Sequence, residues 1–512
     1  MKKHLLSLSI LLSVICGYAQ PSSWQKSLGG SDLDEVISIQ QTTDGGYIMA
    51  GFTYSNDADV IGNHGEFDSW IVKLTNTGSI EWQKSLGGTG RDYACSIEQT
   101  TDGGYIIAGG SNLNDGDVTG NHGGNDCWIV KLSNTGSIQW QKSLGGTDYD
   151  YANSIQQTSD GGYIMAGYTG SNDGDFNGNH GSNDYWIVKL TNTGSIEWQK
   201  SLGGSYSDEA RSIRQTTDGG YIIAGSSYSI NGDVTGNHGQ SDYWVVKLTN
   251  TGSIQWQKCL GGSGWDHANS IQQTTDGGYI IAGSTQSNNG DVNGNHGLSD
   301  SWIVKLSNSG SIQWQKCLGG IGDDDPYSIV QTPDGGYIIA GSTRSNDGDV
   351  TGNHGLSDYW IVKLTNTGSI QWQKCLGGTG VDYANSIQQT TDGGYIIAGY
   401  TESNDGNVTG NHGGSDAWII KLLSDGTLST NESSTENLIS VYPNPANNEI
   451  HLNAKENTLG MRYTLYDHLG RAVMSGKLEE QDSTIVTSHL SKGVYILSIG
   501  DKIKTNRKII KE

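Results

Sequence analysis

Hydrophobic and polar positions follow a single pattern that recurs every 58 residues through most of the chain. In the first full unit, short β-branched or aromatic stretches over 37–43, 47–53, 70–75 and 79–86 are separated by polar turns. The first turn is Asp44-Gly45-Gly46 and the last is Asn76-Thr77-Gly78. This spacing predicts four strands per unit. Because several stretches are apolar on both faces, we expect sheets that pack face to face.

Two tryptophans mark the period. One opens the Trp-Gln-Lys triplet and the other lies in the third predicted strand of the unit. The first set is Trp24, Trp82, Trp140, Trp198, Trp256, Trp314 and Trp372. The second set is Trp70, Trp128, Trp186, Trp244, Trp302, Trp360 and Trp418. A fixed period of this length without insertions is typical of a repeat architecture.

The ends of the repeat region decide between an open solenoid and a closed ring. A solenoid needs a polar cap at each end. Here residues 21–28 form a lone fourth strand, while the seventh unit supplies three strands through Leu422 and has Thr430 where Trp is expected. Strand 21–28 would therefore complete the last sheet, which removes an exposed edge. We predict an all-β, seven-bladed β-propeller over residues 20–425.

The glycine content and the N-terminus support this picture. The chain has 76 glycines and 5 prolines, as expected for many tight turns between short strands. Residues 1–19 have a basic start, an apolar middle and small residues at Gly17 and Ala19. They resemble a secretory signal cleaved after Ala19, and no other segment is apolar enough to span a membrane. The odd number of cysteines that would remain argues against a full disulfide framework.

Charge is divided unequally between the repeats and the C-terminal region. From Leu438 onward there are 10 Lys and Arg against 8 Asp and Glu, whereas the preceding mature chain has 18 against 46, a net charge of −28. Such a field repels nucleic acid and anionic membranes and attracts cations or neutral polar partners. We therefore expect no nucleic-acid partner.

The long loop between the second and third strands carries a pair of Asp or Asn side chains around a Gly turn. Alternating oxygens of this kind suit calcium, although the third Asp and the distal Glu of a full calcium loop are absent. The same side chains also cap turns, which is the alternative interpretation. The acidic members are Asp57, Asp59, Asp115, Asp117, Asp173, Asp175, Asp233, Asp291, Asp347, Asp349 and Asp405. No other cofactor is predicted.

Two further residues recur in all copies. The loop histidines are candidates for a metal, a pH switch or, as we expect, a hydrogen bond that anchors the loop. They are His64, His122, His180, His238, His296, His354 and His412. The acidic residues of the inter-blade connector are expected to be structural, because seven equivalent carboxylates lack the unequal environments that acid–base catalysis needs. They are Asp34, Asp92, Asp150, Asp208, Asp266, Asp324 and Asp382.

A single active site should appear where the copies differ. The clearest departures are Arg91, Arg211, Trp265, His267, Asp323, Asp325 and Arg344. No nucleophile–base pair, zinc motif or phosphate-binding glycine motif accompanies them, so we predict no catalytic residues.

Two resemblances follow from these motifs. The series Leu74, Gly78 and Trp82 resembles the tryptophan-docking motif of pyrroloquinoline-quinone-type propellers, in which the Trp packs on a Gly of the next blade. This resemblance implies the fold only. After the linker 426–437, residues 438–512 resemble the C-terminal sorting domain of the Bacteroidota type IX secretion system. The motifs, in order, are Tyr442-Pro443-Asn444-Pro445, Asp467 with Gly470-Arg471, and Leu490 with Gly493 and Tyr495.

The sorting-domain resemblance implies a small β-sandwich that is recognised by the secretion machinery, after export through the periplasm to the outer-membrane surface or the medium. For the whole chain we consider three hypotheses. The first is a monomeric surface protein that binds glycan or protein through its loop-rich face. The second is a polysaccharide hydrolase or lyase with its site in the channel, and the third is a spacer without a specific ligand.

Overall fold

The computed structural model describes residues 23–428, 439–442, 445–454, 460–467, 471–478, 480, 482–499 and 505–511. The predicted signal sequence, and the linker apart from 426–428, lie outside the described residues. The chain divides into two compact units, residues 1–428 and 429–512. The described residues contain strands and no helix, which confirms the all-β prediction. None of them forms a helix long and apolar enough to cross a membrane.

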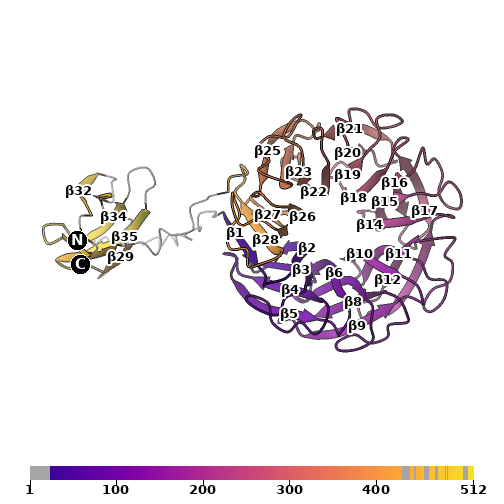
Figure 1. Ribbon diagram of the computed structural model, residues 1–512, viewed down its shortest axis with the longest axis horizontal. Helices are drawn as coiled ribbons and strands as arrows, with labels where there is room; N and C mark the ends of the chain where they lie inside the picture. Colours follow the sequence, from indigo (N-terminus) through magenta and orange to yellow (C-terminus); the bar gives the residue numbers. More distant parts are fainter. Residues whose placement is uncertain are drawn as a thin grey trace, which may run out of the picture. The chain divides into compact units, whose positions relative to one another are not determined.

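The first unit consists of seven four-stranded antiparallel sheets, called blades here, arranged around a central opening (Figure 1). The first blade contains β2 (Asp34–Gln41), β3 (Tyr47–Thr53), β4 (Asp68–Leu74) and β5 (Ile80–Leu86). Blade 2 contains β6 (Asp92–Gln99), β7 (Tyr105–Ser111), β8 (Asp126–Leu132) and β9 (Ile138–Leu144). Blade 3 contains β10 (Asp150–Gln157), β11 (Tyr163–Thr169), β12 (Asp184–Leu190) and β13 (Ile196–Leu202).

The remaining blades follow the same plan. Blade 4 contains β14 (Asp208–Gln215), β15 (Tyr221–Ser227), β16 (Asp242–Leu248) and β17 (Ile254–Leu260). Blade 5 contains β18 (Asp266–Gln273), β19 (Tyr279–Thr285), β20 (Asp300–Leu306) and β21 (Ile312–Leu318). Blade 6 contains β22 (Asp324–Gln331), β23 (Tyr337–Thr343), β24 (Asp358–Leu364) and β25 (Ile370–Leu376).

The seventh blade joins the two ends of the repeat region. Its strands β26 (Asp382–Gln389), β27 (Tyr395–Thr401) and β28 (Asp416–Leu422) are followed in the sheet by β1 (Trp24–Leu28). Strand β1 pairs antiparallel with β28 along its whole length, from Trp24 opposite Lys421 to Leu28 opposite Ala417. The N-terminal strand thus occupies the outer position that β5 occupies in the first blade.

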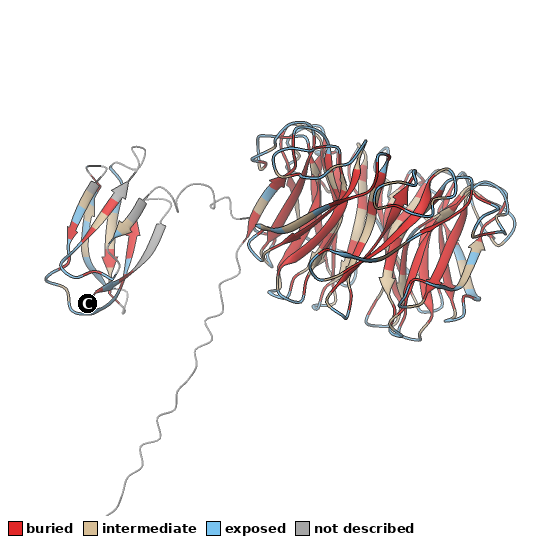
Figure 2. Cartoon of the chain, turned by 90° about the horizontal axis from the view of Figure 1, so that it is seen from below, coloured by how far each residue is buried: buried red, intermediate tan, exposed pale blue. Residues whose placement is uncertain are grey.

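Strand order explains the burial pattern. The innermost strands carry Ser and Gln toward the channel, whereas the second and third strands are buried almost throughout (Figure 2). Hydrophobic clusters form between neighbouring blades; Ile164 and Ala166 of blade 3, for example, pack with Ile223 and Trp244 of blade 4. The core is therefore a series of seven interfaces between sheets, as the two-sided apolar strands predict.

Two predicted boundaries were wrong by a few residues. The inner strand begins at Asp34 rather than at Ile37, and the third strand begins at Asp68 rather than at Trp70. The inner strand contains a bulge between Val36 and Ser38, which interrupts the alternation from which its start was predicted. The recurring Asp of the connector is therefore the first residue of the inner strand.

The second unit is a β-sandwich of two sheets with its own core, including Leu465, Leu497 and Ile509. One sheet contains β29 (Ile439–Tyr442), β30 (Glu449–Ala454) and β33 (Asp482–Val486). The other contains β32 (Ala472–Lys477), β31 (Arg462–Tyr466), β34 (Gly493–Ile499) and β35 (Thr505–Lys511). The side chain of Asp467, next to β31, accepts hydrogen bonds from the backbone N–H and guanidinium of Arg471, next to β32.

Candidate functional site

Each Trp of the Trp-Gln-Lys triplet packs on a glycine of the next blade. A Cβ built on Gly78 would lie 2.8 Å from a ring carbon of Trp24, and one on Gly252 would lie 2.9 Å from Trp198. Both glycines also have positive φ, +80° and +77°. A side chain at either position is therefore disfavoured both by the contact with the Trp ring and by the backbone conformation. These contacts have the arrangement of the tryptophan-docking motif and repeat at every blade junction.

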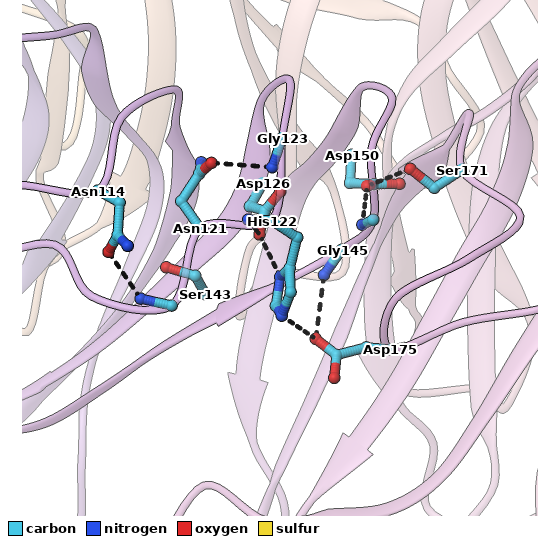
Figure 3. Close-up of polar contacts among 12 residues, drawn as sticks. Asn114, Asn121, His122, Gly123, Asp126, Ser143, Gly145, Asp150, Ser171 and Asp175 are labelled. Carbon is cyan, nitrogen blue, oxygen red and sulfur yellow. Dashed lines mark hydrogen bonds and ion pairs between the residues drawn. The ribbon is translucent and has the colours of Figure 1, made fainter.

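The first residue of each inner strand is a buried aspartate that holds its connector. In blade 1, Asp34 accepts hydrogen bonds from the backbone N–H of Gly30 at 2.7 Å and from Ser55 Oγ at 2.8 Å, and it also accepts one from the hydroxyl of Thr53. The same contacts recur around Asp150 (Figure 3). In these two blades both carboxylate oxygens are buried and accept hydrogen bonds from the protein, so they serve the fold and not a substrate.

A second aspartate, at the start of each third strand, was not singled out from the sequence. It accepts from the loop histidine: His122 Nδ1 lies 2.7 Å from Asp126 Oδ2, and the equivalent distances in the other blades are 2.5–2.7 Å (Figure 3). The histidine therefore anchors the loop. Its signal was present in the sequence, because this residue is Asp in all seven copies: Asp68, Asp126, Asp184, Asp242, Asp300, Asp358 and Asp416.

The two aspartate series meet at the blade junctions. A Cβ on Gly261 would lie 2.7 Å from Asp242 Oδ1 of blade 4 and 2.6 Å from Asp266 Oδ2 of blade 5, so the two carboxylates flank this glycine. Burial, with a smaller contribution from Asp266, raises the pKa of Asp242 to about 6 even though His238 acts against the shift. Among the described atoms, Asp242 Oδ1 has no hydrogen-bond partner.

In the predicted calcium loops, the carboxylate oxygens accept hydrogen bonds from backbone N–H groups. Asp173 Oδ1 accepts from Thr147 N–H at 2.8 Å. Asp175 Oδ2 accepts from Gly145 N–H at 3.3 Å (Figure 3). Asp175 also lies 3.9 Å from His122 Nε2 of the preceding blade. No group of three or more His, Cys, Asp or Glu among the described residues is arranged to hold a metal. Calcium binding stays a prediction.

Differences between copies concentrate on one rim of the ring, called the variable rim here. The residue before each inner strand is a different type in all seven copies, and the residues after the second strand and before the third strand also vary. These three positions lie at strand ends on the same side of a blade; Arg344 N–H, for example, donates to Asp323 O. The first of these positions holds Leu33, Arg91, Tyr149, Ser207, Trp265, Asp323 and Val381.

All seven departures from symmetry noted in the sequence belong to this rim or to the adjoining start of an inner strand. By contrast, the turns at the opposite rim, Asp44-Gly45-Gly46 and its equivalents, are the same in all copies. Inside the blades, the junction contacts are equally constant. The variable rim is therefore the surface on which this protein differs from a symmetric scaffold.

Blades 1 to 3 cover their part of the rim with a continuous group of aromatic rings, called the aromatic ribbon. Neighbouring ring centroids lie 4.8–6.5 Å apart, and Tyr54 and Tyr149 remain 41% and 57% exposed. The ribbon consists of Phe52, Tyr54, Phe67, Tyr93, Tyr149, Tyr151 and Tyr168. Rings of this kind supply flat, amphipathic contact surface.

The charges on the rim are mainly negative. Its arginines are all paired with carboxylates: Arg91 with Glu66 at 2.5 Å, Arg211 with Glu209 at 2.9 Å and Arg344 with Asp323 at 3.5 Å. Glu35, Asp325 and Glu402 have no ion-pair partner among the described residues. Burial first, and then the charge of Glu402, raises the pKa of Glu35 to about 7. The rim thus disfavours anionic ligands.

Residues 440–512 match the model of the secretion system C-terminal sorting domain. The second unit is such a sorting domain. The protein is therefore exported by the type IX secretion system to the cell surface or beyond, with a propeller-like unit of repeated four-stranded sheets as its cargo. A comparison with curated proteins found no match.

Several solved structures are similar to this chain in fold. PorZ, described as an essential surface component of the type IX secretion system of Porphyromonas gingivalis, is 11% identical, with a TM-score of 0.40, over 96% of this chain and 61% of that one. The chain thus spans about three-fifths of the length of PorZ. The extracellular domain of BT4673 from B. thetaiotaomicron is 12% identical over 93% of this chain and 68% of that one, with a TM-score of 0.33.

BamB from Moraxella catarrhalis is a third structure of this kind. It is 14% identical over 79% of this chain and 97% of that one, with a TM-score of 0.33. Identities and scores this low carry no information about what the present chain binds.

Proposed function

We propose that this protein is a surface-displayed binding protein whose variable rim recognises an extracellular glycan without acidic groups. The observation that carries the proposal is the concentration of copy-to-copy differences on one rim, while the junction contacts and the Asp-Gly-Gly turns of the opposite rim are the same in all copies. A spacer without a ligand has no reason to vary one rim and conserve the other within a single chain. Binding explains the difference, since a ligand contacts one face.

The chemistry of the rim supports a glycan. Partly exposed rings of the aromatic ribbon can stack on the apolar faces of sugar rings, and the carboxylates of Glu35 and Glu402 can accept hydrogen bonds from hydroxyl groups. Unpaired carboxylates repel uronic acids and sulfate esters. Neutral glycans therefore fit best, and weak contacts on several blades would add through avidity.

The test uses substitutions that copy one blade onto another, so that each new residue already occurs at the equivalent position. Tyr149→Ser takes the residue of Ser207, and Trp265→Val takes that of Val381. On the opposite rim, Asn134→Ser takes the residue of Ser424 and serves as the control. On an array of neutral, acidic and amino-bearing glycans, we expect binding of neutral glycans to fall roughly 5- to 100-fold for Tyr149→Ser and to be unchanged for Asn134→Ser, since one aromatic contact contributes about 1–3 kcal/mol.

Equal binding by Tyr149→Ser, Trp265→Val and the parent protein would refute the assignment of the rim. Binding confined to acidic glycans would refute the preference for neutral ones. Binding of proteins alone would support the alternative of a protein ligand.

A polysaccharide hydrolase is the second candidate, and one observation favours it. Burial, and then the charge of Glu402, raises the pKa of Glu35 to about 7, which suits a carboxyl group for general acid or base catalysis near neutral pH. Release of new reducing ends from a polysaccharide, abolished in Glu35→Gln, would establish this activity. Release that persists in Glu35→Gln would place the activity elsewhere.

A further inference from the structure

The central channel contains a cavity of about 270 Å³ that is lined by the inner strands of all seven blades. One lining position follows the bulge of each inner strand by two residues and is Gln in four copies. The seven residues at this position are Gln40, Glu98, Gln156, Arg214, Gln272, Val330 and Gln388. This cavity lies away from the variable rim, because the inner strands begin at that rim and the lining residues come from the later part of each strand, after its bulge.

The side-chain oxygens of the cavity glutamines accept hydrogen bonds from backbone N–H groups of the protein. Gln40 Oε1 accepts from the backbone N–H of Gln99 at 2.7 Å, and Gln156 Oε1 accepts from Gln215 N–H at 2.7 Å. The orientation of these amides follows from the bonds, because a backbone N–H can only meet the oxygen. The NH₂ groups therefore remain as donors.

The serines two residues earlier behave in the same way. Ser38 Oγ accepts from Ile97 N–H at 3.3 Å, and Ser270 Oγ accepts from Ile329 N–H at 3.3 Å. Each hydroxyl keeps its proton for another acceptor. The cavity wall is thus rich in hydrogen-bond donors whose own acceptors are already occupied.

Arg214 adds a positive charge to this wall. One of its terminal nitrogens donates to Ile213 O at 2.9 Å and to Ser154 Oγ at 3.3 Å. Within the described part of the chain, no carboxylate lies within the 4.0 Å limit of an ion pair with its guanidinium. The Arg214 side chain is half-buried, and its remaining N–H groups have no protein acceptor among the described residues, so they can donate to a ligand in the channel.

Glu98 is the other charged residue at this position of the ring. Its Oε2 accepts from Gln157 N–H at 2.9 Å, so that it replaces a glutamine oxygen and does not contact Arg214. Burial raises the pKa of Glu98, against the opposing effects of the Gln157 N–H and Arg214. Glu98 weakens the positive potential of the cavity without neutralising it by contact.

We propose that Arg214 and the surrounding serine and glutamine donors form a binding site for a small oxyanion within the channel. A guanidinium matches the geometry of a carboxylate, phosphate or sulfate through two parallel N–H donors. The volume of about 270 Å³ is below the range of roughly 300–1,000 Å³ typical for drug-sized ligands, so it holds an ion or one anionic group and no polysaccharide chain. This inference does not depend on the proposed function of the rim.

The chain offers matched variants for the test. Arg214→Gln and Glu98→Gln each restore the residue found in the symmetric copies, so both should fold. In Arg214→Gln, the new amide oxygen can also accept a hydrogen bond from Gln273 N–H, as the glutamines at the equivalent positions of other blades accept from theirs. We expect this variant to melt no lower than the parent protein.

Calorimetric titration of the full chain with acetate, phosphate and sulfate, against chloride as the control, measures the site. We expect saturable binding of at least one oxyanion, a roughly 10- to 100-fold loss in Arg214→Gln, since charge-assisted hydrogen bonds contribute about 1.5–3 kcal/mol, and tighter binding in Glu98→Gln. A second arm with a galacturonate disaccharide distinguishes a free ion from an anionic group on a larger molecule. If the disaccharide binds as tightly as acetate and loses affinity equally in Arg214→Gln, the site accepts both.

Three results would overturn the proposal. The first is absence of saturable oxyanion binding by the parent protein. The second is unchanged affinity in Arg214→Gln, which would show that any effect of sulfate is its general exclusion from protein surfaces. The third is weaker binding in Glu98→Gln, which would indicate that the glutamate is a ligand and that the site prefers cations.

Discussion

Removal of the Trp24 ring tests whether the N-terminal strand completes the seventh blade. Trp24 is 4% exposed, packs on Gly78, lies 5.7 Å from the ring of Tyr47 and donates from Nε1 to Asn76 O at 3.2 Å. Truncation of a buried Trp to Ala costs about 3–5 kcal/mol, and the lost hydrogen bond adds about 1 kcal/mol. We therefore expect Trp24→Ala to lower the free energy of unfolding by about 4–6 kcal/mol.

The control is Trp198→Ala, which removes the equivalent, partly buried ring at a junction inside the chain. Trp198 packs on Gly252 and lies 5.8 Å from Tyr221. With an unfolding entropy of about 2.1 cal/mol/K per residue and roughly 400 residues in the unit, a loss of 4–6 kcal/mol corresponds to about 5–7 °C in Tm. Scanning calorimetry of the parent and both variants measures this shift. The reasoning is refuted if Trp198→Ala is destabilised and Trp24→Ala melts with the parent, because β1 would then contribute nothing to the ring.

Three further predictions concern the junctions and loops. Burial raises the pKa of Asp208 to about 6, so the neutral acid is favoured in the folded state, and the stability that it contributes is complete below about pH 4 and is lost as the pH rises through 6. Asp208→Asn should therefore cost up to about 3 kcal/mol less at pH 7.5 than at pH 4, and an equal cost at both values, measured by urea unfolding, would contradict the shift. Gly252→Ala, with positive φ and a ring carbon 2.9 Å from the new Cβ, should destabilise the fold by roughly 2–4 kcal/mol in the same assay; stability equal to the parent would show that Trp198 does not pack there. Because the loop oxygens already accept from backbone N–H groups, we expect a calcium chelator to leave Tm unchanged, whereas a fall in Tm that added calcium reverses would establish the calcium loops.

The sequence predicts the blade well because its determinants are local. Turn residues and two-sided apolar stretches locate four strands per unit, and the unmatched strand at each end of the repeats indicates how they pair. The errors at Asp34 and Asp68 arise because the bulge and the buried polar start of each strand interrupt the apolar pattern. Strand limits that depend on polar contacts cannot be read from hydrophobicity.

The site was harder to predict from the sequence than the fold, since it depends on contacts between blades. The departures from symmetry are visible in the sequence, but their common position on one rim follows only when strand ends are assigned to a side of the ring. The partnership of Asp242 with Asp266, and the solitary charge of Arg214, require two or three blades to be placed together. Comparison of the copies indicated Asp266 as one of seven recurring carboxylates, whereas Asp242 and Arg214 were identified only from the structure.

The way in which the last blade is shared between the two ends of the repeat region also affects how the number of repeats can change in evolution. Counted from Trp24, each 58-residue segment begins with the outer strand of one blade and ends with the turn that leads into the outer strand of the next, so these segments and the blades are out of phase by one strand. In-frame recombination between two copies of the repeat removes or adds one complete 58-residue segment. The repeat region of the product still begins with an outer strand and ends with a third strand, and these two strands can still pair to complete the last blade. Duplication and loss can therefore alter the number of blades, or shuffle rim residues between them, without any compensating change at the seam. The ring can gain new combinations of rim residues by rearrangement as well as by point mutation.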